Sequence, residues 1–114
     1  MSFNTVRSLS QAAARSTAST AAQTAVGLVA GQILAADSNR KGLIIVNTGT
    51  SIIYLILGSG TPTATIYHVA LRPATTADDG SGGVYIDDSW VGAVQALSSA
   101  AGGTLVITTI SEAT

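Results

Sequence analysis

The chain has 114 residues, of which 46% are hydrophobic, 10% are charged and 4% are aromatic, and its formal net charge is −1. A chain of this length forms one domain, and its high apolar and low charged content excludes a disordered protein. The near-zero net charge excludes a general electrostatic attraction to nucleic acid or to an acidic membrane surface. Because few charges are available to solvate a free surface, the composition favours a subunit that is packed against other proteins.

Residue types exclude several kinds of site. The sequence has no cysteine, so neither a disulfide nor a thiolate metal site can form. Its one histidine, His68, has no partners for a structural zinc site. The longest apolar stretch, Ala25 to Ala36, is too short to span a bilayer and contains Gln32. We therefore predict no metal, no cofactor and no membrane segment.

Residues 1–24 are rich in Ser, Thr and Ala and are predicted to be an N-terminal arm that contacts other subunits. Val6 and Leu9 have a loose helical spacing, and the alanine content of Gln11 to Ala22 favours a helix, but Ser and Thr weaken this pattern. We therefore expect the arm to be extended or partly helical. The absence of acids before Asp37 also resembles an organelle presequence, which is an alternative.

From residue 25 to residue 114, short apolar runs alternate with turn residues, which is typical of an all-β domain. The expected strands cover residues 26–34 (one strand or two), 42–46, 52–57, 64–71, 84–86, 91–97 and 104–110. The turn residues Asn47 to Thr50 predict a hairpin that pairs 52–57 with 42–46. We predict a single small antiparallel β-sandwich or jelly roll of about seven or eight strands.

Residues 43–46 and 52–57 are unusual because their apolar residues do not alternate with polar ones. Both faces of these strands are therefore apolar, whereas a two-layer domain has only one interior. We predict that their outer faces are covered by the N-terminal arm, a neighbouring subunit or a host surface. The alternative is that the chain's own loops cover them.

No set of residues forms a catalytic constellation, so we predict that the protein is not an enzyme. His68 is expected to be a hydrogen-bonded structural or interface residue, since no acid or second histidine is available to complete a serine triad. The acid pairs Asp78-Asp79 and Asp87-Asp88 are expected to be solvated loop residues, with a calcium site as the alternative.

The basic pair Arg40-Lys41 and the single tryptophan bear on recognition of ligands. Arg40 and Lys41 stand alone before a strand, with no further basic residues nearby to form a stripe that would bind nucleic acid. Trp90, the single tryptophan, is expected to anchor the core or an interface, with a sugar-stacking platform as the alternative.

Several segments of strand and turn residues give the sequence its most distinctive pattern. They are Asn39-Arg40-Lys41-Gly42-Leu43-Ile44-Ile45-Val46-Asn47-Thr48-Gly49, Ile53-Tyr54-Leu55, Leu57-Gly58-Ser59-Gly60-Thr61, Trp90 to Val94, and Gly102-Gly103-Thr104-Leu105-Val106-Ile107-Thr108. Together, over residues 25–109, they resemble the small β-domains of tailed-bacteriophage structural proteins. Such domains occur as head decoration or cement proteins, and related ones occur in neck, tail and fibre proteins.

The resemblance implies a capsid decoration (cement) protein on the outer surface of the virion, which binds the major capsid protein and stabilises the shell. We expect a homo-oligomer, either a trimer or a dimer, because symmetric oligomers are the norm, and we expect no nucleic-acid or membrane partner. A neck, tail or fibre component is an alternative, as is a glycan- or receptor-binding module that uses Trp90, Tyr54, Tyr67 and Tyr85. The residues predicted to contact partner proteins are Phe3, Val6, Arg7, Leu9, Arg15, Ile52, Tyr54 and Trp90.

Overall fold

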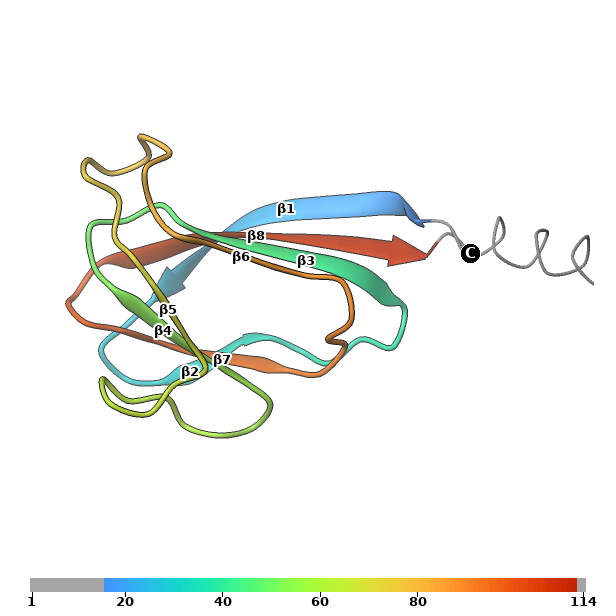
Figure 1. Ribbon diagram of the computed structural model, residues 1–114, viewed down its shortest axis with the longest axis horizontal. Helices are drawn as coiled ribbons and strands as arrows, with labels where there is room; N and C mark the ends of the chain where they lie inside the picture. The colour runs from blue at the N-terminus through green and yellow to red at the C-terminus, as the bar shows by residue number, and fades with distance from the viewer. Residues whose placement is uncertain (1–15, 113–114) are drawn as a thin grey trace, which may run out of the picture.

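The computed structural model describes residues 16–112 (Figure 1). Within this range there is no helix, and the chain forms eight strands. They are β1 (Ser16–Val26), β2 (Gly31–Leu34), β3 (Arg40–Asn47), β4 (Ile53–Leu57), β5 (Val69–Leu71), β6 (Val84–Asp87), β7 (Val94–Ser98) and β8 (Gly103–Glu112). The predicted all-β class is confirmed.

The strands form two four-stranded antiparallel sheets that face each other. Sheet A has the order β1-β8-β3-β6 and lies above sheet B, which has the order β2-β7-β4-β5, in the view of Figure 1. Strand β1 pairs with β8, β2 with β7, β3 with β6 and β4 with β5. The chain is therefore one long antiparallel ribbon whose successive strand pairs lie alternately in the two sheets, which is the arrangement of a jelly roll.

The core lies between the two sheets because every second residue of a strand points to the same face. In β3 these residues are Leu43 and Ile45, which are 1% and 0% exposed. Each of the other central strands contributes its own alternate residues to the same cluster. They are Ile53 and Leu55 from β4, Val94 and Ala96 from β7, and Leu105 and Ile107 from β8.

The predicted hairpin between residues 42–46 and 52–57 is wrong, because β3 lies in sheet A and β4 in sheet B. The turn that follows β3 carries the chain across the sandwich. The amide of Asn47 is buried there and donates to the carbonyls of Ser51 (2.7 Å) and Leu71 (3.0 Å). Its Oδ1 accepts the N–H of Gly49 (3.1 Å). Asn47 thus binds the corner to β5 of the opposite sheet, and β4 pairs with β5 and β7 instead of with β3.

The first strand begins inside the segment that was predicted to be an arm. Residues 16–24 are part of β1, which pairs with β8 from Ser16 opposite Glu112 to Val26 opposite Gly103. The helix considered for residues 11–22 is therefore wrong for residues 16–22, which form strand. Ser, Thr and Ala fix no conformation strongly, and the unpaired backbone groups of β8 offer this segment ten residues of ladder. The remainder of the predicted arm, residues 1–15, lies outside the described residues.

Candidate interaction surface

The outer face of sheet A carries six apolar side chains. Because Leu43, Ile45 and Leu105 point into the core, their strand neighbours point away from it. We refer to this group as the outer apolar face, and it consists of Ile44, Val46, Val84, Ile86, Val106 and Ile110.

Strand register places these side chains in continuous rows across the sheet. Ile86 is opposite Ile44, and Ile44 is opposite Thr108. In the adjacent row Val84 is opposite Val46, and Val46 is opposite Val106. Directly opposite side chains on one face of a sheet are in contact distance of each other. The rows therefore form one surface.

Ile110 extends this surface at one end, where a glycine makes room for it. A Cβ atom placed on Gly42, its cross-strand partner, would lie 3.2 Å from the Ile110 Cδ1 atom, so Ile110 leans over the bare backbone. On the far side of β8 the rows end at Ala21 and Gln23 of β1. None of these residues is charged.

The size of this surface follows from strand geometry. One outward side chain covers roughly 30 Å² of sheet, because it occupies about 6.6 Å along the strand and about 4.8 Å across it. The six apolar residues and their uncharged neighbours Thr108, Ala21 and Gln23 therefore cover on the order of 300 Å². This surface is uncharged and mainly apolar, and the largest apolar patch on a monomer is often functional. At the edge strand, Val84 and Ile86 are 52% and 71% exposed.

Sheet B also has apolar side chains on its outer face, but a loop of the same chain covers them. Residues 58–68 form this loop, so the strand predicted for residues 64–71 is wrong for 64–68, and only Val69–Leu71 is strand. Ile56 lies beneath the loop at 7% exposure, next to Gly60. The ring of Tyr67 lies 5.2 Å from the ring of Tyr54. For β4 the alternative is therefore the one observed, because the chain's own loop covers its outer face, whereas β3 keeps its outer face partly exposed.

Of the eight residues predicted to contact partners, the structure describes Ile52, Tyr54 and Trp90, and it does not bring these three together. Tyr54 lies on the outer face of sheet B against Tyr67. Ile52 lies in the turn before β4, where its N–H donates to Ser99 Oγ (3.0 Å). Trp90 packs against the core, and its Nε1 donates to the Ala93 carbonyl (3.0 Å). The other five, Phe3, Val6, Arg7, Leu9 and Arg15, lie outside the described residues.

The residues of the outer apolar face were not predicted individually, although a signal for them was present. The run of apolar residues in β3 indicated two apolar faces, and the alternation in β6 places Val84 and Ile86 on one side. What the sequence did not give was the pairing that aligns these strands with Val106 and Ile110 of β8.

Arg40 has a structural role at the start of β3. It is 3% exposed. Its Nη2 donates to the Gly92 carbonyl (2.6 Å), its Nε to the Trp90 carbonyl (3.2 Å) and its Nη1 to the Ala35 carbonyl (3.3 Å). The guanidinium therefore binds the start of β3 to two segments, the one between β2 and β3 and the one between β6 and β7. It is buried and not presented to solvent.

Asp87 organises the turn after β6. Its Oδ1 accepts the N–H groups of Ser89 (2.6 Å) and Trp90 (2.7 Å), and its Oδ2 accepts the hydroxyl of Tyr85 (2.6 Å). The Tyr85 hydroxyl, followed by these backbone N–H groups, holds the pKa of Asp87 well below its usual range. Burial, together with the hydrogen bond to Asp87, raises the pKa of Tyr85 to about 12. The carboxylate of Asp87 thus stabilises the turn between β6 and β7 by accepting these hydrogen bonds.

The remaining candidates for chemistry also make hydrogen bonds within the chain itself. Asp79 accepts both the hydroxyl (2.6 Å) and the N–H (2.8 Å) of Ser81, which lower its pKa. His68 Nδ1 accepts the N–H of Leu57 (3.0 Å), in agreement with a structural role. Among residues 16–112 no group of three or more His, Cys, Asp or Glu side chains is placed to hold a metal ion. In the same range no helix has the length and hydropathy needed to cross a membrane.

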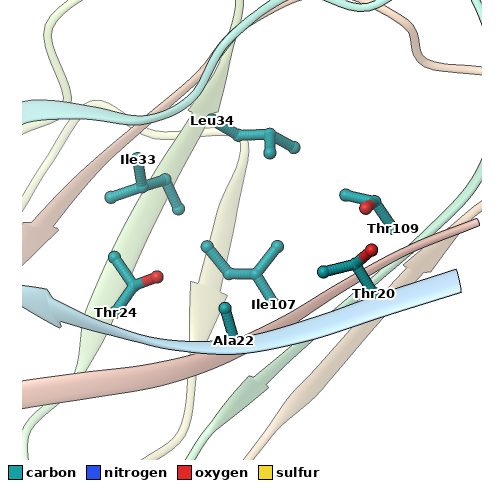
Figure 2. A pocket seen from close by; sticks show the side chains of 7 residues that line it. All are labelled: Thr20, Ala22, Thr24, Ile33, Leu34, Ile107 and Thr109. Carbon is teal, nitrogen blue, oxygen red and sulfur yellow. The ribbon is translucent and has the colours of Figure 1, made fainter.

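A hollow of about 220 Å³ opens between the sheets beside β1 (Figure 2). It is lined by Thr20, Ala22, Thr24, Ile33, Leu34, Ile107 and Thr109. Its walls are mainly apolar, and threonine hydroxyls are their only side-chain polar groups. Such a lining offers packing space and no acid or base.

Comparisons with known proteins identify no family for this chain. No family model matches the sequence, and no curated protein matches it. Among solved structures, a protein of Bacillus endospore appendages, described as a family of disulfide-linked pili, aligns over 90% of this chain and 94% of its own, with 15% identity and a TM-score of 0.48. The dTDP-4-dehydrorhamnose 3,5-epimerase of Bacillus anthracis aligns over 100% of this chain and 62% of its own, with 11% identity and a TM-score of 0.42. At these values neither likeness carries an argument about function.

Proposed function

We propose that the protein is a non-enzymatic structural protein of a tailed-phage virion, a capsid decoration protein that seats its outer apolar face on the major capsid protein. The observation that carries this proposal is the continuous uncharged surface formed by Ile44, Val46, Val84, Ile86, Val106 and Ile110. The sequence resemblance of residues 25–109 to tailed-phage structural proteins supports a place in the virion. A decoration role in turn implies a location on the outer surface of the capsid.

The size of the face supports binding as an oligomer. A patch on the order of 300 Å² on each partner buries about 600 Å² in total, whereas a stable specific interface buries roughly 1,200–2,000 Å². One copy alone therefore falls short by about half. A homo-oligomer that presents several such faces in one direction reaches the necessary area, and its joined subunits bind with a higher effective concentration.

The distribution of aromatic residues does not favour the glycan-binding alternative. Tyr54 and Tyr67 form a pair on sheet B, whereas Tyr85 and Trp90 both pack against the core. A sugar platform needs several exposed rings together, and of the four only Tyr67 is exposed.

The experiment that tests the proposal is co-sedimentation of the purified protein with capsids that lack it. Val84→Lys combined with Ile86→Lys places two charges on the outer apolar face at exposed positions, so the fold is retained and we expect binding to be lost. The matched control is Ile66→Lys, which changes an equally exposed isoleucine (65%) in the loop over sheet B and is expected to bind like the unaltered protein.

The opposite outcomes are also informative. If the folded double variant sediments with capsids as the unaltered protein does, the outer apolar face is not the contact. If the unaltered protein does not bind capsids, the decoration role is wrong, and neck, tail and fibre structures become the targets. Deletion of residues 1–15 tests the predicted arm separately, since it leaves β1 whole, whereas deletion of residues 1–24 would remove most of that strand.

A further inference from the structure

The four edge strands of the sandwich differ greatly in length. Strand β1 has 11 residues, whereas β6 has 4, β2 has 4 and β5 has 3. An edge strand leaves the N–H and C=O groups of every second residue without a ladder partner. Among residues 16–112, no strand pairs with β1 on the edge opposite β8, so about ten of its backbone groups have no ladder partner there.

Strand β1 also lacks the features that protect sheet edges from pairing. Its sequence, Ser16–Val26, contains no charged residue and no proline. Its register with β8 shifts only between Ser16 and Ala18 and is regular from there to Val26. The edge of β6, in contrast, is short and ends in Asp87, with Asp88 next. Natural proteins usually protect edges by shortness, charge, proline or bulges, and β1 has none of these over its regular part.

The side of the sandwich along β1 has open space between the two sheets, although the N–H of Ser98 in β7 donates to the carbonyl of Gly27, just after β1 (3.0 Å). Two hollows, of about 220 Å³ and about 120 Å³, lie between β1 and β2, and both are lined by residues of these two strands. On the opposite side, the N–H of Gly83 donates to the Arg72 carbonyl across the sheets (2.8 Å). The sandwich is thus incomplete along the strand whose edge is free.

We infer that the free edge of β1 pairs antiparallel with β1 of a second copy, about a two-fold axis perpendicular to sheet A. Sheet A of one copy and sheet A of the other then form one continuous sheet of eight strands. A second copy of β1 is the occupant that fits best, because both strands are long and uncharged, so no like charges oppose each other. Pairing of β1 with the four-residue β6 of another copy would leave most of the edge unpaired.

This axis directs both outer apolar faces to the same side of the extended sheet. The apolar surface doubles, and the area that it buries against a partner rises from about 600 Å² to about 1,200 Å², which reaches the size of a stable interface. This doubling rests on the proposed function. The pairing itself does not, because it uses the edge of the sheet and not its face.

The symmetry makes a specific geometric prediction. In an antiparallel pair, directly opposite residues point to the same face of the sheet, so about a two-fold axis one residue of β1 lies opposite itself. The cysteines of two copies at that residue are within reach of a disulfide. A residue two positions away is separated from its own copy by four residues, about 13 Å, which is beyond that reach.

The test is a scan of single cysteines along β1, from Ala18 to Ala25, in a chain that contains no other cysteine. After mild oxidation we expect covalent dimer to peak at one position and to fall at least tenfold two positions away on either side. Sedimentation equilibrium of the unaltered protein measures the dimer. Pairing along the whole of β1 puts the axis at its middle residue, Ala21, so we expect Ala21→Lys to convert the dimer to monomer by placing like charges across the axis.

Each other outcome overturns the inference. A monomer or a trimer does so, as does a dimer whose cross-linking shows no single maximum along β1. Thr108→Lys separates this test from that of the proposed function, because Thr108 is the cross-strand neighbour of Ala21 but lies on β8 in the interior of the sheet. We expect this variant to keep the dimer and to lose capsid binding.

Discussion

Arg40 provides a sharp test of the packing in this sandwich. Replacement by methionine keeps most of the side-chain volume and removes three hydrogen bonds to the carbonyls of Gly92, Trp90 and Ala35. The bond to Gly92 is short at 2.6 Å and charge-assisted, and its net contribution is about 2 kcal/mol, whereas the bonds of 3.2 and 3.3 Å contribute about 0.5–1 kcal/mol each. Methionine does not require removal of a charge from water, which offsets part of the loss. We expect the free energy of unfolding to fall by about 3 kcal/mol.

Equilibrium unfolding in urea measures this change. Trp90 is the single tryptophan and accepts one of the hydrogen bonds through its carbonyl, so its fluorescence reports the local structure while far-UV circular dichroism reports the whole sheet. The matched control is Arg72→Met, an identical substitution at an exposed position, which we expect to change stability by less than about 0.5 kcal/mol. If Arg40→Met is as stable as this control, the three hydrogen bonds contribute nothing and our account of this corner is wrong.

Two further predictions concern the other corner and the effect of pH. A Cβ atom at Gly82 would overlap the carbonyl oxygen of Asn47, so Gly82→Ala should destabilise the protein by about 3 kcal/mol or more, whereas Gly31→Ala, which has open space around it, should be neutral or slightly stabilising in the same urea assay. The pKa of Tyr85 is raised to about 12 from an ordinary value of about 10, so the folded state disfavours its ionised form. The contribution of Tyr85 to stability should therefore be constant below about pH 10 and fall by about 1 kcal/mol as the pH rises toward 12, a modest change because the phenol is only partly buried. Tyr85→Phe should abolish that part of the pH dependence, and an unchanged slope would show that ionisation of Tyr85 is not its origin.

The sequence predicted the class of fold because its strands carry local signals. The apolar run of β3 includes residues 42–46, where a strand was expected. A Gly-rich turn begins just before β8, which includes the strand expected at residues 104–110. The pairing of strands was not predictable in the same way. The turn after β3 has hairpin residues, yet the Asn47 amide binds Ser51 and Leu71, and Leu71 is distant in sequence. A local turn pattern contains no information about such a bond.

Long-range contacts also explain the differences at Arg40 and in β1. Arg40 was considered only as part of a basic pair, because two of its three acceptors lie 50 and 52 residues further along the chain. Strand β1 has one large apolar residue, Val26, to mark it, and it is a strand because β8 provides a ladder. For the outer apolar face, the sequence indicated that a second apolar surface exists, and only the register of β3, β6 and β8 showed which residues form it.

The pairing of Ser16 with Glu112 determines how the sandwich responds to mechanical force. The chain enters β1 and leaves β8 at neighbouring points, about 5 Å apart. A force applied between these two points acts on one end of the β1–β8 pair. It breaks the hydrogen bonds between these strands one residue pair at a time, instead of loading all of them together. Two labels or displayed peptides attached at both points would, by the same geometry, stand side by side.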